Sequence, residues 1–200
     1  MSRPAPAELL AALAGAMAAR RWRWYVFGAQ AVVVHGRPRL TADVDASVDI
    51  AGAEPEALVE ALAAQGFELR FPLSAEHLRG ARLLPMVHTA SAMPLDLTIA
   101  AAGIDQEFLD RARPFDLGGV VVPVISAEDL VAMKVLAGRR KDLEDVRGVL
   151  VEQEGRLDLE RIRDVLSAIE AAIGEHTLLP RLERLVRAAR AGGRAKRGKG

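Results

Sequence analysis

Residues 25–50 read YVFGAQAVVVHGRPRLTADVDASVDI, and this stretch decides the fold that the sequence predicts. An apolar run ends at Gly28-Ala29, where glycine permits a tight turn, and a short apolar helix is expected after it. The basic turn 36–39 then leads into the acidic segment 41–45, TADVD. The pattern indicates a strand, a turn into a helix, and a second strand that begins with two acids.

The two acids, Asp43 and Asp45, are separated by one residue. In a strand, residues i and i+2 point to the same side, so both carboxylates are expected on one face, opposite Val44 and Val48. Adjacent carboxylates repel each other, and a hard cation such as Mg2+ offsets their charge, typically with substrate phosphates as further ligands. A bare D-x-D pattern is more often a solvated strand face, so both interpretations stay open at this point.

A third acid, Asp96, lies between Leu95 and Leu97 in an apolar strand predicted over residues 95–100. A charge inside such a strand is costly unless it is paired or bound to a metal. This favours a functional role for Asp96 over a surface one.

The order of these motifs resembles the polymerase-beta-like nucleotidyltransferase superfamily, and within it the minimal and AbiEii-type toxin branch of prokaryotes. The matching segments are Gly28-Ala29, Ala31–Gly36, Arg39–Asp45, Asp96 in PLDLTIA, and Lys134–Asp145 in KVLAGRRKDLED. Each motif is weak by itself, but their combined order is fairly specific. The sequence departs from the pattern at Ala29, where many active members carry Ser, so a hydroxyl ligand is absent although the backbone N–H remains.

The resemblance implies an α/β (α+β) fold with a mixed sheet flanked by helices. We expect a nucleotidyltransferase core with an N-terminal helix over residues 1–125. A helical C-terminal region follows over 126–189, packed on the core, and a disordered basic tail over 190–200.

The resemblance also implies roles for individual residues. Asp43, Asp45 and Asp96 would be the catalytic and metal-binding carboxylates for Mg2+ or Mn2+, with Asp96 as the general base. The implied nucleotide-binding residues are Gly28, Ala29, Gln30, Arg39, Thr41, Lys134, Lys141 and Asp142. Asp142 and Asp145, one turn apart on a helix, are expected to brace Lys134 or Lys141. From the residues alone, Lys134 is as readily a solvent-facing lysine.

The implied substrates are a nucleoside triphosphate and an acceptor, which the toxin branch suggests is RNA, for example a tRNA end, with a cognate antitoxin as partner. Two alternatives remain. One is a small-molecule acceptor such as an antibiotic. The other is a catalytically weak nucleotide-binding module, which Ala29 favours and the three carboxylates oppose.

Composition sets the remaining limits. The 200 residues are 50% hydrophobic and 27% charged and contain no cysteine, which excludes disulfides and thiolate zinc sites. No apolar run is long enough for a membrane span and no signal pattern is present, so a cytoplasmic location without membrane contact is expected. The sequence also predicts a polar loop over 72–82 and, because of Pro123, an edge strand over 120–125. A basic stripe on the last helix at Arg181, Arg184, Arg187 and Arg190 fits RNA contact or a solvated face equally well.

Overall fold

The computed structural model describes the backbone of residues 4–197 and the side chains of residues 4–191. Within these limits the chain forms two compact units. The first comprises the described residues up to Gln30 together with Leu40–Ile125, and the second comprises Ala31–Arg39 together with the described residues from Ser126. The chain passes into the second unit after Ile125, and the nine residues 31–39 also belong to the second unit.

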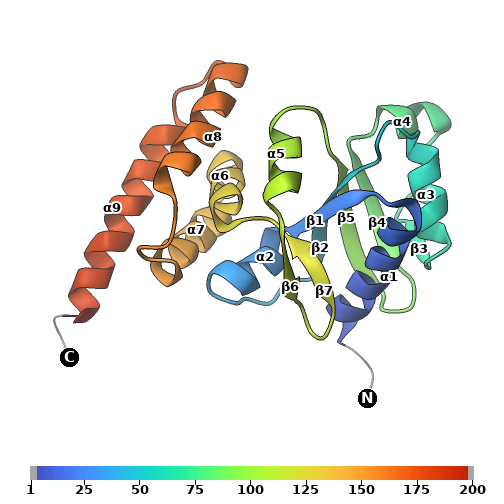
Figure 1. Cartoon of the computed structure of the whole chain (residues 1–200), viewed down its shortest axis with the longest axis horizontal. Helices are drawn as coiled ribbons and strands as arrows, with labels where there is room; N and C mark the ends of the chain where they lie inside the picture. Colours follow the sequence, from blue (N-terminus) through green and yellow to red (C-terminus); the bar gives the residue numbers. More distant parts are fainter. Residues whose placement is uncertain (1–3, 198–200) are drawn as a thin grey trace. The chain divides into compact units, whose positions relative to one another are not determined.

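The first unit is built on a mixed seven-stranded sheet (Figure 1). Its strands are β1 (Arg23–Phe27), β2 (Val44–Asp49), β3 (Phe67–Leu69), β4 (Leu83–His88), β5 (Met93–Ile99), β6 (Arg113–Asp116) and β7 (Val121–Val124). Their order across the sheet is β3-β4-β5-β2-β1-β7-β6, with β2 parallel to β5 and antiparallel to β1. This confirms the predicted fold class.

The second strand, β2, lies at the centre of the sheet and separates two chemically different faces. Val44, Ala46 and Val48 are fully buried, whereas Asp45 and Asp49 on the other face are partly exposed. In β5 the same alternation buries Leu95, Leu97 and Ile99. Neighbours in register share a face, so the apolar residues of the two strands form one core. The acids face away from it.

Helices complete the first unit. They are α1 (Ala5–Arg20), α3 (Pro55–Ala63), α4 (Ala75–Gly80) and α5 (Ile104–Arg111), while α2 (Gly28–His35) begins in the first unit and ends in the second. Helix α1 packs against α3 and β5, and its buried residues are Ala7, Leu9, Leu10, Leu13, Ala16 and Met17. These side chains supply much of the apolar layer against the sheet.

Two local predictions were wrong, and one strand was missed. The segment 72–82 contains the short helix α4, whose N-cap Ser74 accepts a hydrogen bond from the His77 N–H. Residues Arg113–Asp116 form β6, which the sequence analysis missed. Strand β7 is not an edge strand, because it pairs with both β1 and β6. Its Pro123 lies opposite Pro114 of β6.

The second unit consists of helices. Besides the end of α2, they are α6 (Ala127–Ala137), α7 (Arg140–Glu152), α8 (Leu159–Ile173) and α9 (Leu178–Arg197). Segment 31–39 is fixed to α7 by a close backbone approach, since a Cβ atom added at Gly36 would lie 2.9 Å from Val149 Cγ2 and 3.2 Å from its N atom. Gln153 Nε2 also donates a hydrogen bond to the His35 carbonyl, at 3.0 Å.

Glu170 joins two helices of this unit. It is buried, and its Oε1 accepts hydrogen bonds from the N–H groups of Leu178 and Leu179 at the start of α9. Of the predicted disordered tail, 190–200, residues 190–197 belong to α9, and residues 198–200 lie outside the described part of the chain. Among residues 4–197, no helix combines the length and apolar character that crossing a membrane requires.

Candidate active site

The turn after β1 is shaped around one carboxylate. Gly28 has a φ of +61°, a left-handed conformation that favours glycine. A Cβ atom added at Gly28 would lie 1.8 Å from Asp45 Oδ2 and 2.6 Å from its Cγ. The Asp45 side chain therefore occupies the space that any other residue at position 28 would need. Gly28 is required both for the turn and for the position of this acid.

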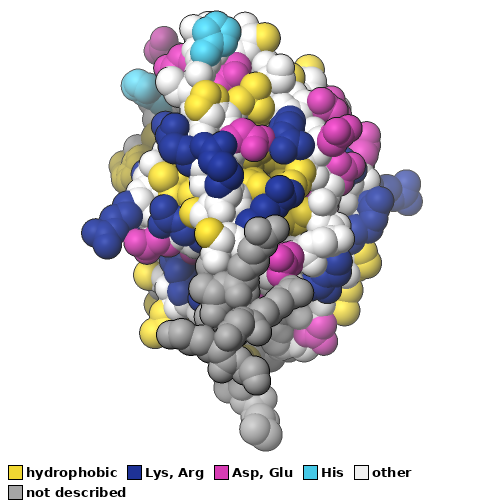
Figure 2. Space-filling view, turned by 90° about the vertical axis from the view of Figure 1, so that its left-hand side faces the viewer, with side chains coloured by type: hydrophobic (Ala, Val, Ile, Leu, Met, Phe, Trp, Pro, Cys, Tyr) yellow, Lys and Arg dark blue, Asp and Glu magenta, His cyan; other side chains and the backbone are white. Residues whose placement is uncertain are grey.

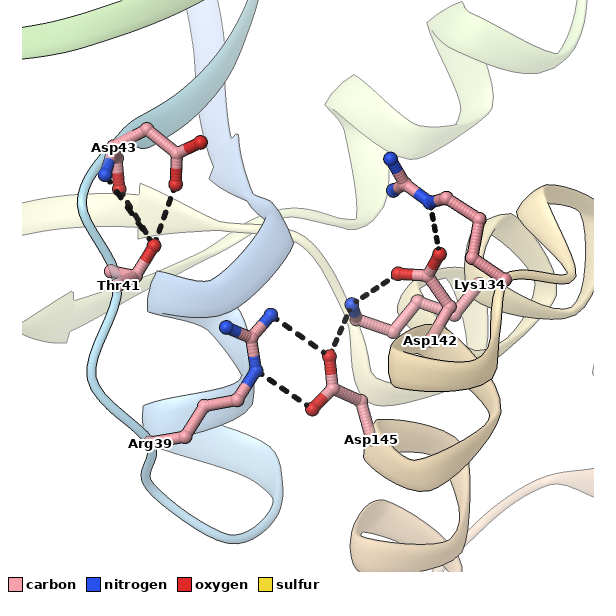
Figure 3. Close-up of polar contacts among 7 residues, drawn as sticks. Arg39, Thr41, Asp43, Lys134, Asp142 and Asp145 are labelled. Carbon is pink, nitrogen blue, oxygen red and sulfur yellow. Dashed lines mark hydrogen bonds and ion pairs between the residues drawn. The ribbon is translucent and has the colours of Figure 1, made fainter.

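The second acid, Asp43, lies just before β2 and is oriented by Thr41. The Thr41 hydroxyl donates a hydrogen bond of 2.6 Å to Asp43 Oδ1 (Figure 3). The Asp43 N–H points back at the Thr41 hydroxyl oxygen, at 3.5 Å. Thr41 thus orients an acid, and its predicted contact with the nucleotide stays a prediction.

The third acid, Asp96, lies beside Asp45 in the sheet. The two residues are register partners on the parallel strands β2 and β5, which places their Cα atoms about 5 Å apart. Register partners point to the same face, so the structure brings Asp45 and Asp96 together. Asp43 has the same strand parity as Asp45.

Asp96 is not buried as the sequence analysis expected. Leu95 and Leu97 face the core, but the Asp96 side chain points to the opposite face and is 30% exposed. Its Oδ1 forms an ion pair with Arg70, which follows β3. Arg70 was missed because nothing in the local sequence marks it. Only the pairing of β3 with β4 and of β4 with β5 brings it to Asp96.

The carboxylates fit Mg2+ in their chemistry, since oxygen atoms are the ligands this ion prefers. Within the described part of the chain, no three His, Asp or Glu groups lie close enough together to hold a metal ion by themselves. Protein sites for Mg2+ typically use one or two carboxylates and complete the shell with substrate phosphates and water. Asp43 and Asp45 supply that smaller donor set.

The start of α2 supplies backbone donors next to Asp45. Gly28, Ala29 and Gln30 are its first three residues, and their N–H groups have no carbonyl partner within the helix. The side chains of Ala29 and Gln30 are buried, with exposed fractions of 3% and 7%. Burial of Ala29 explains why a methyl group is accepted there.

The second unit holds a separate cluster of charged side chains (Figure 3). Lys134 Nζ donates to Asp145 Oδ2 at 2.7 Å and to Asp142 Oδ1 at 3.1 Å. Arg39 donates two hydrogen bonds to Asp145, from Nε to Oδ1 at 3.0 Å and from a terminal nitrogen to Oδ2 at 3.2 Å. Arg139 Nε donates to Asp142 at 2.5 Å. This cluster joins segment 31–39, α6 and α7.

The cluster answers one open question about Lys134. Its side chain is only 7% exposed, so the interpretation as a solvent-facing lysine is wrong. The predicted bracing by Asp142 and Asp145 is confirmed, whereas Lys141 is exposed. The predicted contact of Lys134 and Arg39 with the triphosphate stays a prediction, because their recorded partners are these acids.

The pKa of Asp142 is lowered in this cluster. Desolvation by burial is the largest influence and raises its pKa, but hydrogen bonds from Arg139 and Lys134, with their charges, outweigh it. The pKa of Asp142 is therefore below its ordinary value. The fold therefore favours the ionised form of this carboxylate.

The arginines of α9 do not form one exposed basic stripe, because Arg181 differs from the other three. Arg181 donates a hydrogen bond of 2.7 Å to the Val135 carbonyl at the end of α6, where helix carbonyls lack partners. Arg184, Arg187 and Arg190 are exposed. Figure 2 shows Lys and Arg side chains on this side of the second unit, with acidic and apolar side chains between them. The face is mixed in charge.

The chain matches one family of known proteins. The family described as "Nucleotidyltransferase of unknown function (DUF6036)" matches residues 10–178. No curated protein matches the chain significantly.

Several solved structures are similar to the chain, among them the following three. The solution structure of the antibiotic-resistance factor ANT(2'')-Ia has a TM-score of 0.57 at 15% identity, covering 84% of this chain and 93% of that one. The crystal structure of ANT(2'')-Ia in complex with adenylyl-2''-tobramycin has a TM-score of 0.56 at 14% identity, with coverages of 84% and 98%. An antigenic nucleotidyltransferase-like protein from Paracoccidioides brasiliensis has a TM-score of 0.50 at 17% identity, with both coverages 92%. At these identities the likeness shows the fold.

Proposed function

Because the chain belongs to the nucleotidyltransferase family of unknown function DUF6036, we propose that it moves a nucleotide from a nucleoside triphosphate to a hydroxyl or phosphate group of an acceptor, with Mg2+ or Mn2+ as cofactor. One observation carries the proposal. The Gly28 turn lies directly against Asp45, and Asp96 lies beside Asp45 on the neighbouring strand. Phosphate-binding amides, metal-binding carboxylates and a candidate base thus lie on one sheet face.

Each group has a role in this reaction. Asp43 and Asp45 would hold the metal, with Asp96 as the third acid. When bound, the metal would neutralise charge on the triphosphate and lower the pKa of the acceptor oxygen. The N–H groups of Gly28, Ala29 and Gln30 donate to the phosphates, as helix N-termini commonly do.

The transfer step then follows from the position of Asp96. The acceptor oxygen attacks the α-phosphorus and forms the new P–O bond, while the bond to the bridging oxygen breaks and pyrophosphate leaves. Asp96 accepts the proton of the attacking hydroxyl. For this, the ion pair between Asp96 and Arg70 must open.

Two acceptor classes have support. RNA, with a cognate antitoxin as regulator, rests on the resemblance of residues 24–150 to the AbiEii-type branch. A small molecule is favoured by the fold shared with ANT(2'')-Ia, whose crystal structure holds adenylyl-2''-tobramycin. A catalytically weak nucleotide-binding module is the third reading, which Ala29 favours.

The test is incubation with each labelled nucleoside triphosphate and Mg2+, in the presence of total tRNA or of tobramycin. Label on RNA or on the small molecule identifies the acceptor class, and nucleotide binding without transfer supports the binding module. Asp43→Asn and Asp45→Asn should abolish transfer. Without metal, their melting temperatures should stay unchanged or rise, because repulsion between carboxylates is relieved.

Asp164→Asn, at an exposed position on α8, is the matched control and should keep full activity. Normal turnover in both Asp43→Asn and Asp45→Asn would remove these residues from the site.

A further inference from the structure

An open groove of about 660 Å3 lies within the first unit, next to Asp96. It is lined by Arg70, Phe71, Leu73, His77, Ala81, Leu83 and Pro85. Strand β4 contributes Leu83 and Pro85, and the segment that contains α4 contributes His77 and Ala81. Its volume is that of a site for a small molecule, roughly 300–1,000 Å3.

The groove shares a sheet face with the Asp96 carboxylate. Pro85 lies directly opposite Asp96 in the antiparallel pairing of β4 with β5, and Leu83 lies opposite Thr98. Residues directly opposite each other point to the same face. The Arg70 N–H donates to the Pro85 carbonyl at 2.9 Å, which sets Arg70 beside Pro85. A molecule in the groove would therefore lie beside the proposed base.

The lining of the groove has a distinct chemistry. It contains no Asp or Glu, and its one permanently charged side chain is that of Arg70. Phe71 and Leu83 are large apolar residues that remain 53% and 49% exposed. Such surfaces suit a ring, and the cation suits an anionic group. Among the side chains that line the groove, the one permanent charge that a polycationic acceptor would meet is that of Arg70, which repels it.

Arg70 belongs both to the groove and to the site, because the residue lines the groove and its guanidinium pairs with Asp96. A guanidinium binds carboxylate and phosphate groups with similar two-pronged geometry, so an anion in the groove can replace Asp96 as its partner. The replacement would release Asp96 at the moment when an acceptor is present.

We propose that the acceptor is a small hydroxyl compound with a ring and one carboxylate or phosphate group, and that Arg70 selects it by exchanging Asp96 for that anionic group. This inference rests on the proposed nucleotidyl transfer. Arg70 is a specificity residue here, and Asp96 remains the group that takes the proton of the acceptor hydroxyl.

The test uses three probes that share a hydroxymethyl-substituted benzene ring. Their para substituents are negative, neutral or positive: 4-(hydroxymethyl)benzoate, 1,4-benzenedimethanol and 4-(hydroxymethyl)benzylamine. Binding is measured by NMR titration without nucleotide. The benzoate should bind most tightly and the amine most weakly. Arg70→Gln should weaken benzoate binding by about tenfold or more, the scale of a lost hydrogen bond to a charged group, with little effect on the neutral probe. Arg70→Lys should keep part of the preference.

Two further variants complete the design. Arg113→Gln is the matched control, because Arg113 is exposed on β6 of the same unit and donates only to nearby carbonyls. It should change nothing. Leu83→Glu puts an acid at a half-exposed position of the groove and should reverse the order of benzoate and amine. This variant tests the groove even if Arg70→Gln fails to fold.

Equal binding of the three probes, or unchanged benzoate binding in Arg70→Gln, would overturn the proposal. If an unstructured oligoribonucleotide displaces the benzoate and binds more tightly, the acceptor is RNA and the proposal of a small acceptor is wrong. Calorimetry with nucleoside triphosphate and Mg2+ is run in parallel. If the protein binds no nucleoside triphosphate but discriminates the probes, the proposed function is contradicted. If it binds nucleoside triphosphate but does not discriminate the probes, only this inference is contradicted.

Discussion

The carboxylate of Asp45 lies against the Cα atom of Gly28, so closely that a Cβ atom at position 28 would stand 1.8 Å from Asp45 Oδ2. The contact links the turn after β1 with the central strand β2. Because Phe27 and Asp45 are register partners, the sheet itself holds the two segments together. The position of the acid and the glycine turn cannot change independently.

Gly28→Ala should therefore destabilise the protein more than loss of a left-handed glycine does elsewhere. Gly52→Ala is the matched control, because Gly52 has a φ of +79° but no neighbouring atom within 4 Å of an added Cβ. The control should cost about 1–2 kcal/mol of unfolding free energy from backbone strain alone. Gly28→Ala adds displacement of Asp45, and we expect both a larger loss in urea unfolding and the loss of nucleotidyl transfer. Equal losses in the two variants would contradict the close contact.

Asp96→Asn should separate activity from stability. Its side chain and that of Arg70 are 30% and 37% exposed, and ion pairs with such access to solvent contribute only about 0–1 kcal/mol. We therefore expect a small change in metal-free melting temperature and a loss of single-turnover transfer of about 10²-fold or more, the scale for a general base. Asp49→Asn is the control, because it breaks the partly exposed ion pair between Arg23 and Asp49 of β2, and it should keep activity. Retained transfer in Asp96→Asn would remove Asp96 from the chemistry.

Lys134→Ala should strongly destabilise the second unit. It leaves the buried carboxylates of Asp142 and Asp145 with one cation fewer, and breaking a buried pair typically costs about 3–5 kcal/mol. Lys141→Ala, at an exposed position of α7, should stay within about 0.5 kcal/mol. Urea unfolding measures both variants. Similar stability for the two would mean that the cluster contributes little to the fold.

The low pKa of Asp142 predicts a specific dependence on pH. Its pKa in the fold lies below the ordinary value of 3.8 that applies in the unfolded chain. The folded protein thus holds this proton less tightly than the unfolded one. The stabilisation is complete above the unfolded pKa and is lost as the pH falls through the folded one. The difference in unfolding free energy between wild type and Asp142→Asn should be largest near neutral pH.

That difference should shrink below about pH 4. Urea unfolding from pH 7 to pH 3 measures both proteins. A constant gap for Asp142→Asn would contradict the pKa assignment.

Local sequence was sufficient where a residue's role depends on its immediate neighbours. The alternation in β2 predicted that Asp45 faces away from the buried Val44 and Val48, as the structure shows. Ser126 likewise acts locally, because it caps α6 by accepting a hydrogen bond from the Asp129 N–H three residues on. Gly28 was recognisable as a turn residue for the same reason. Each of these features is decided within four residues of chain.

Sequence reasoning failed where a partner lies far along the chain. Arg70 is 26 residues from Asp96, and no local pattern connects them. Pro123 predicted an edge strand, but pairing with the unforeseen β6 covers that edge. Segment 72–82 is polar because α4 has one buried face residue, Leu78, which gives too weak a period to identify a helix.

The sequence by itself determined the order of turn, strand and acids around residues 25–50, because backbone sterics and the two-residue period of a strand act locally. Only the tertiary structure decided the state of the acids. Asp96 faces outward and pairs with Arg70, while Lys134 lies buried between Asp142 and Asp145. The physical reason is that exposure and charge pairing are set by which distant segments the sheet and the helices bring together.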